Sequence, residues 1–170
     1  LAEAAEQVGG MLLAGLSMTS RGGGLTDAAR RGAVVALRRM GGQDAARALY
    51  LGLVGPPLGD AALRRAGSQS LSASPVAHYI GRALGTMGEV RLLTDALNAA
   101  THEFMLANST RTQAAALEGI AYLPAERDPV RLLQGFLQSG TSGQFQNAVG
   151  AALGRAVRRM GTDQDTGADQ

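Results

Sequence analysis

The chain has 170 residues, a length that suits one domain with a substantial hydrophobic core and requires neither a disulfide nor a metal for stability. Apolar residues make up 45% and charged residues 18%, which is typical of a soluble globular protein and excludes a disordered chain. Cysteine is absent, so thiolate metal sites and cysteine nucleophiles are excluded. All 16 basic side chains are arginines, and the net charge of +2 is too small for a dedicated polyanion-binding protein.

Apolar residues follow a helical period along nearly the whole chain. Spacings of three and four dominate, and alanine and leucine far outnumber β-branched residues, which predicts an all-α fold. No apolar run reaches the roughly 18 to 20 residues of a membrane span. Glycine- and proline-rich breaks divide the chain into expected helices at about 2–18, 26–40, 44–54, 75–87, 89–107, 110–122, 128–138 and 144–160, with a short one at 59–66.

One stretch at a helix end recurs. ALRRMGG returns as RALGTMG and as AVRRMGT, and each copy places a glycine directly after the last apolar residue. Gly41, Gly88 and Gly161 are therefore expected to end helices, because glycine tolerates the positive φ of a C-cap. The last ten residues, 161–170, hold three aspartates and no base, and we expect an acidic flexible tail after a helical domain of residues 1–160.

The helices repeat as pairs. The second helix of each pair carries Arg-x-Leu-x-x-x-Leu, and its arginines lie 44 and 40 residues apart, a period typical of helical solenoids with one helix pair per repeat. Aligning the first helices on their ends gives two apolar columns. These are Ala33, Ile80, Ala116 and Leu153 in one column, and Leu37, Leu84, Ile120 and Val157 in the other.

These motifs resemble the HEAT repeat family, particularly its bacterial members. The likeness lies in the Ala-Leu-x-x-Met-Gly ends and in Asp-Pro-Val-Arg-x-Leu at 128–133, and it covers residues 26–160. It implies a short right-handed α–α superhelix (solenoid) of three to four helix pairs, with 1–20 as the second helix of a truncated repeat and 55–74 as a connector. It also implies a ladder in which an arginine of each second helix meets carbonyls or an aspartate of the neighbouring repeat. The ladder arginines are Arg47, Arg91 and Arg131.

A stripe of arginines lies on the side of the first helices that faces away from the apolar columns. Glu118 interrupts it. The stripe is a candidate interaction surface for phosphates or for an acidic protein face, and the alternative is an ordinary solvated charged surface. Its residues are Arg31, Arg38, Arg39, Arg82, Arg155, Arg158 and Arg159.

We find no pattern of residues that indicates catalysis. His78 and His102 have no metal-ligand partner at helical spacing, so no metal site is expected. The RGGG run at 21–24 precedes a helix, but no strand precedes the run and the chain lacks the lysine of a phosphate-binding loop. We expect no catalytic residue and no cofactor.

Three functions stay open. The first is a non-enzymatic protein–protein interaction or scaffold module with an unidentified protein partner, and the chain would be part of a larger protein or assembly. The second is nucleic-acid binding through the arginine stripe, as in HEAT-fold alkylpurine DNA glycosylases. The third is an enzyme of the bilin-lyase kind, which shares HEAT-like repeats. The chain begins with Leu1 rather than methionine, so we expect a processed or cut N-terminus. A cytoplasmic location is favoured, and a secreted or periplasmic one stays open.

Overall fold

The computed structural model describes residues 27–54, 76–102, 109–139 and 143–165, together with the isolated positions 3 and 7. Within these residues the chain is helical apart from short turns and contains no strand, which confirms the all-α prediction there. The elements are α2 (Asp27–Met40), α3 (Gly42–Val54), α5 (Val76–Thr86), α6 (Val90–His102), α7 (Ser109–Ala121), the 3₁₀ helix η3 (Ala125–Arg127), α8 (Pro129–Ser139) and α9 (Gly143–Asp165).

The predicted helix boundaries agree to within two residues wherever both ends are described, with α9 as the exception. The predicted helix at 59–66, the connector at 55–74 and nearly all of the helix at 2–18 lie outside the described residues. Helix α9 continues to Asp165, so the prediction that Gly161 ends it was wrong. The hydroxyl of Thr162 donates to the carbonyl oxygens of Arg158 and Arg159, so the side chain after this glycine supports the helix. The first five residues of the expected tail are thus helical.

Glycine does end two of the other helices. Gly41 has a φ of 67° and Gly88 a φ of 77°, both in the left-handed region that favours glycine. At the end of α5 the amide of Gly88 donates to the carbonyl of Gly85, and the amide of Glu89 donates to the carbonyl of Leu84. These two bonds form a Schellman motif, in which the glycine lets the chain reverse at once into α6.

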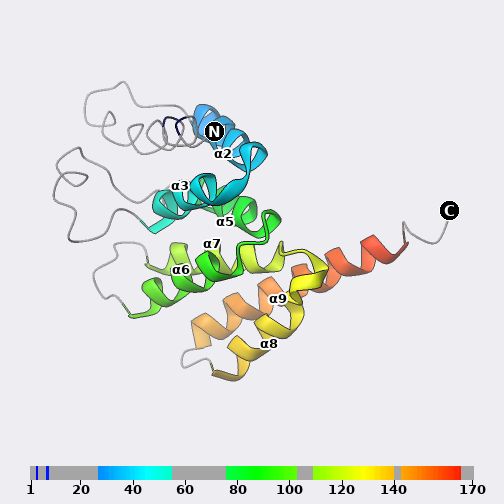
Figure 1. Cartoon of the computed structure of the whole chain (residues 1–170). Coiled ribbons are helices and arrows are strands. Elements are labelled where there is room, and N and C mark those ends of the chain that lie inside the picture. Colours follow the sequence, from blue (N-terminus) through cyan, green and yellow to red (C-terminus); the bar gives the residue numbers. More distant parts are fainter. Residues whose placement is uncertain are drawn as a thin grey trace.

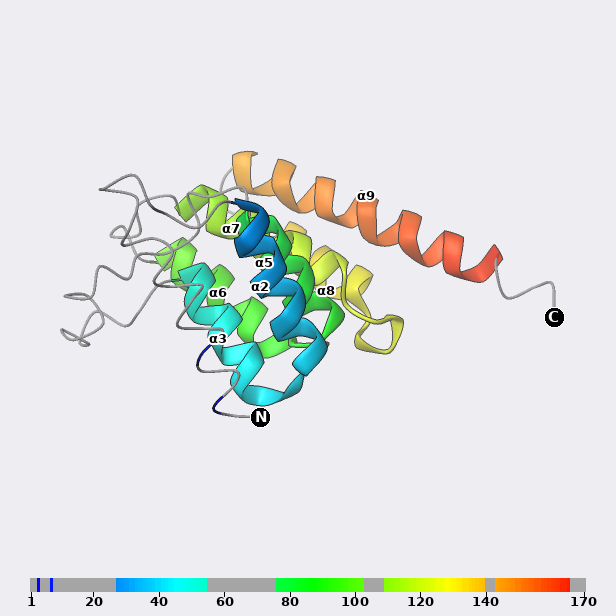
Figure 2. The ribbon, with the colours of Figure 1, turned by 90° about the horizontal axis from the view of Figure 1, so that it is seen from above.

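The helices form two layers. In one layer α2 contacts α5, α5 contacts α7, and α7 contacts α9; we call these the first helices. The second helices, α3, α6 and α8, follow α2, α5 and α7 in the chain and pack beside them. Figure 1 shows the pairs following one another down the molecule from α2 to α9. Figure 2, a view turned by 90°, shows the C-terminal part of α9 projecting beyond the other helices.

The apolar columns form the core between the layers. Leu37, Leu84 and Ile120 are buried, as are the leucines at corresponding positions of the second helices, Leu49, Leu93 and Leu133. Val157 departs from its column and is 54% exposed. Helix α9 packs against α7 and α8, and among the described residues no other helix covers the part of its surface that carries Val157.

Small residues bring α5 and α7 unusually close together. Gly81 and Gly85 lie one turn apart on α5 and face Ala115 and Gly119, one turn apart on α7. A Cβ added at Gly81 would overlap the carbonyl oxygen of Ala115, and one added at Gly85 would overlap that of Gly119. The two backbones are therefore in direct contact, an approach that only glycine allows.

Candidate functional site

Glu118, in the middle of α7, is the most buried charged residue that the structure describes. Its side chain is only 3% exposed. Nε of Arg82 donates a hydrogen bond of 2.6 Å to Oε1 of its carboxylate. Nδ1 of His78 forms a hydrogen bond of 2.5 Å with Oε2, and both of these partners come from α5. Nη1 of Arg155, from α9, lies 3.2 Å from Oε2. We call these four residues the Glu118 cluster. It ties α7 to the first helices on both of its sides.

The partners keep Glu118 ionised. Burial by itself would raise the pKa of its carboxyl group, but the hydrogen bonds from Arg82 and His78 and their positive charge outweigh that effect. The pKa of Glu118 therefore lies below the ordinary glutamate value. Arg82 responds in the opposite direction: burial works against its charge, but the contact with Glu118 raises its pKa further above the usual range. At neutral pH the cluster contains a fixed negative charge between two fixed positive charges.

A series of alternating arginine and tyrosine side chains crosses the same face. The guanidinium of Arg31 lies 4.6 Å from the centre of the Tyr79 ring, and that of Arg82 lies 5.8 Å from it. Arg82 is also 5.2 Å from the centre of the Tyr122 ring, which Arg159 approaches to 4.4 Å. These are cation–π distances. The series runs from α2 through α5 and the end of α7 to α9, so it connects all four first helices.

Arg159 also holds the end of α7. Its Nη1 donates a hydrogen bond of 2.7 Å to the carbonyl oxygen of Ala121, the last residue of that helix. The last carbonyls of a helix lack a partner within it and carry partial negative charge, so a guanidinium is well suited to this position.

Replacing Arg159 with alanine is expected to lower the free energy of unfolding by about 1–2 kcal/mol, because both a charged hydrogen bond and a cation–π contact are lost. The neighbouring Arg158 is exposed and makes no ion pair within the described residues. Arg158→Ala should therefore change stability by less than about 0.5 kcal/mol. Urea denaturation followed by circular dichroism would measure both. Equal effects of the two substitutions would contradict this account.

The structure places the seven stripe arginines on the first helices but divides them by contact. Arg82 and Arg155 pair with Glu118. Within the described residues the others show two patterns: Arg31 and Arg159 lie over tyrosine rings, whereas the remaining three are exposed and form no ion pair. Those three are Arg38, Arg39 and Arg158.

In the structure Glu118 stands within the stripe and pairs with two of its arginines. Arg82, Glu118 and Arg155 occupy the same column of the repeat alignment. Equivalent positions on adjacent stacked helices become spatial neighbours, so a carboxylate between two arginines is placed to pair with both. The alignment therefore contained the signal for the cluster. His78 gave no such signal, because it lies outside the column that holds Glu118.

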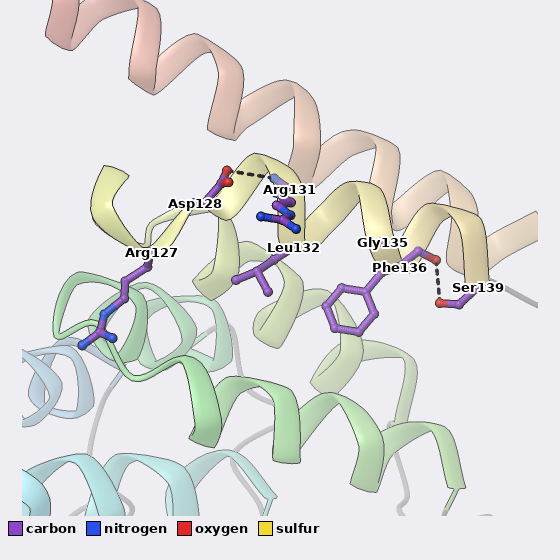
Figure 3. Close-up of a pocket in the computed structure, with 7 residues that line it drawn as sticks. All are labelled: Arg127, Asp128, Arg131, Leu132, Gly135, Phe136 and Ser139. Carbon is purple, nitrogen blue, oxygen red and sulfur yellow. Dashed lines mark hydrogen bonds between the residues drawn. The ribbon is translucent and has the colours of Figure 1, made fainter.

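The second helices carry two open grooves. The larger, of about 640 Å³, lies between α3 and α6, with Arg47 from one helix and Arg91 from the other on its lining together with Asp95. The smaller, of about 560 Å³, is lined by η3 and α8, including Arg131, Leu132 and Phe136. Figure 3 shows the leucine and phenylalanine side chains projecting from α8 on the side that faces α6.

Within the described part of the chain, Arg91 does not make the contact with a neighbouring helix pair that the expected arginine ladder requires. Its side chain is 93% exposed, and its guanidinium lies 3.9 Å from Asp95, one turn further along the same helix rather than in a neighbouring pair. Solvent competes for so exposed a side chain, so this contact contributes little to stability. Arg47 and Arg131 are exposed on the groove linings, and their ladder role stays a prediction.

Among the residues that the structure describes, no three or more histidine and acidic side chains are placed to share a metal ion. None of the described helices is long and apolar enough to cross a membrane. Comparisons of the chain with protein-family models, with curated proteins and with solved structures find no match.

Proposed function

We propose that the chain is a non-enzymatic protein-binding module, built as a short solenoid of HEAT-like helix pairs, and that its second helices receive the partner. The stacking of successive first helices and the repeated columns support the solenoid. The observation that carries the binding proposal is the position of the two grooves, which both lie along α3, α6 and α8. Solenoids bind through such extended surfaces rather than through enclosed pockets.

The lining of the grooves favours a peptide segment of a protein partner. The α3–α6 groove combines Leu51 and Leu92 with charged side chains of both signs, including Arg91 and Asp95. Neither a uniformly charged polymer nor a purely apolar ligand matches this mixture. An amphipathic helix or an extended segment that alternates apolar and charged residues does match it.

The nucleic-acid alternative has less support. It requires a row of free arginines along the first helices, but Arg82 and Arg155 converge on Glu118 and Arg159 is held by Tyr122 and Ala121. A track of phosphates would meet one compact cluster instead of evenly spaced cations. No observation on the described residues favours a bilin-lyase-like enzyme.

The test compares two charge-matched double variants in affinity capture. Arg91→Glu with Arg131→Glu alters the groove face, whereas Arg38→Glu with Arg158→Glu makes the same change of net charge on the first helices. Quantitative mass spectrometry of proteins retained from a native lysate should show partners that are lost from the groove variant and kept by the control variant. Equal loss from both variants would show that binding follows net charge, and no enrichment by the wild-type chain would refute the proposal.

A further inference from the structure

Three positively charged or protonatable side chains converge on one point of the first-helix layer. His78 Nδ1 and Arg155 Nη1 both approach Oε2 of Glu118, and Arg82 Nε approaches Oε1. Because a carboxylate is small, these donors from α5 and α9 lie within a few ångströms of one another. The carboxylate of Glu118, whose side chain is 3% exposed, holds the three donors in this arrangement from its buried position.

Each of the three side chains keeps donor capacity on its solvent side. A guanidinium has five N–H groups, and Arg82 and Arg155 each direct one nitrogen at Glu118 while their side chains stay 44% and 43% exposed. An ionised carboxylate can only accept, so the Nδ1 of His78 carries the hydrogen in that contact. Its Nε2 lies on the other side of the ring, and the side chain is 47% exposed.

We propose that His78, Arg82 and Arg155 form a binding site for a phosphate monoester. The two arginines exceed the charge of Glu118 by one, and a protonated His78 would bring the excess to two. A phosphate monoester carries a charge of about −1.5 to −2 at pH 7 and offers three acceptor oxygens. Planar guanidinium groups match these oxygens in geometry as well as in charge. A carboxylate or a phosphodiester carries only one negative charge, which balances the excess of the two arginines over Glu118 but not the excess of two that a protonated His78 would create.

The site is independent of the grooves. It lies on the first helices α5, α7 and α9, whereas the grooves lie along α3, α6 and α8. Binding of the phosphate requires no rearrangement of Arg82, because Glu118 and the ring of Tyr122 already hold this side chain in place. Such preorganisation reduces the entropy lost on binding.

Titration of the full chain with phenyl phosphate at pH 7 tests the proposal. The chain has two histidines, so nitrogen-detected NMR of the imidazole rings resolves His78 and uses His102, at the end of α6, as an internal reference. We expect a saturable shift of His78 toward the protonated pattern, with a dissociation constant on the order of 1 mM for so open a site. Inorganic phosphate should compete, and an equal ionic strength of sodium chloride should not reproduce the shift.

Two arginines on α9 supply the matched variants. Arg155→Gln should weaken binding by about 10-fold or more, since a charged hydrogen bond is lost, whereas Arg158→Gln should change it by less than about 2-fold. If Arg155→Gln fails to fold, Arg155→Lys keeps the charge but loses the planar fork, and it should still weaken binding.

Three results would overturn the proposal. The first is a wild-type His78 resonance that shows no saturable shift up to about 50 mM phenyl phosphate. The second is an equal loss of affinity in Arg155→Gln and Arg158→Gln. The third is tight binding of a single-stranded oligonucleotide that phenyl phosphate cannot displace, which would assign the surface to a phosphodiester chain. The wild-type titration decides the first point whether or not the variants fold.

Discussion

Gly85→Ala is expected to lower the free energy of unfolding by about 3 kcal/mol, at the upper end of what one added methyl group costs in a packed interior. The new Cβ would overlap the carbonyl oxygen of Gly119 and would lie 3.0 Å from the Cβ of Tyr122. The overlapping atoms belong to the backbone of Gly119, which cannot move away by rotating as the end of a side chain can. Helices α5 and α7 would have to separate, and the contacts around Ile80 and Leu84 would loosen with them.

A thermal melt should show this loss as a fall in Tm of roughly 6–12 °C, given about 2–4 °C per kcal/mol for a chain of this size. Gly150→Ala is the matched control, because Gly150 also lies inside a helix but an added Cβ would meet no atom within 4 Å beyond the adjacent backbone of its own helix. That substitution should stabilise the chain by about 0.5–1 kcal/mol, since alanine loses less backbone entropy in a helix. If Gly85→Ala behaves like the control, then α5 and α7 do not pack backbone to backbone.

Glu118→Gln is expected to lower the free energy of unfolding by about 2 kcal/mol at neutral pH. The change removes the negative charge that holds Arg82, Arg155 and His78 together while keeping the size of the side chain. Breaking a fully buried ion pair costs roughly 3–5 kcal/mol, and the smaller figure applies here because both arginines remain partly solvated. Urea denaturation at pH 7 would measure the difference. A loss under about 0.5 kcal/mol would mean that the cluster does not stabilise the stack.

The stabilities of the wild-type chain and of Glu118→Gln should depend differently on pH in the acid range. The pKa of Glu118 is lowered in the folded chain, so the unfolded chain binds a proton first as the pH falls. The stabilisation is complete above the ordinary glutamate pKa of 4.5 and is lost as the pH falls through the folded value. The stability gap between wild type and Glu118→Gln should therefore narrow as the pH falls below about 4.5. A gap that widens in acid would reverse the assigned direction of the pKa shift.

The helical architecture could be predicted because it depends on local features of the sequence. The spacing of Leu37, Leu84 and Ile120, together with Gly41 and Gly88 after them, determines where the first helices run and end. Prediction failed where tertiary surroundings override that local signal. Gly161 has the same sequence context as the other two glycines but lies inside α9, and Val157 continues an apolar column yet none of the described helices covers it.

The Glu118 cluster was harder to predict from the sequence. The alignment placed Arg82, Glu118 and Arg155 in one column, but interpreting that column as a contact requires knowing that α5, α7 and α9 pack side by side. The tyrosines were harder still. Tyr79 and Tyr122 occupy different columns, and both approach Arg82 only because side chains from adjacent helices reach across one another.

The Glu118 cluster also bears on how the chain unfolds. In a linear stack of helix pairs each pair touches only its neighbours, so the ends can fray while the middle stays folded. Here a single carboxylate on α7 pairs with α5 on one side and with α9 on the other. Detaching α9 would expose Glu118 and weaken its hold on α5, so the loss of α9 would spread to α5. The three helices should consequently open as one cooperative unit, and the amides of α9 around Ala152 and Ala156 should exchange hydrogen at nearly the same rate as those at the centre of α5.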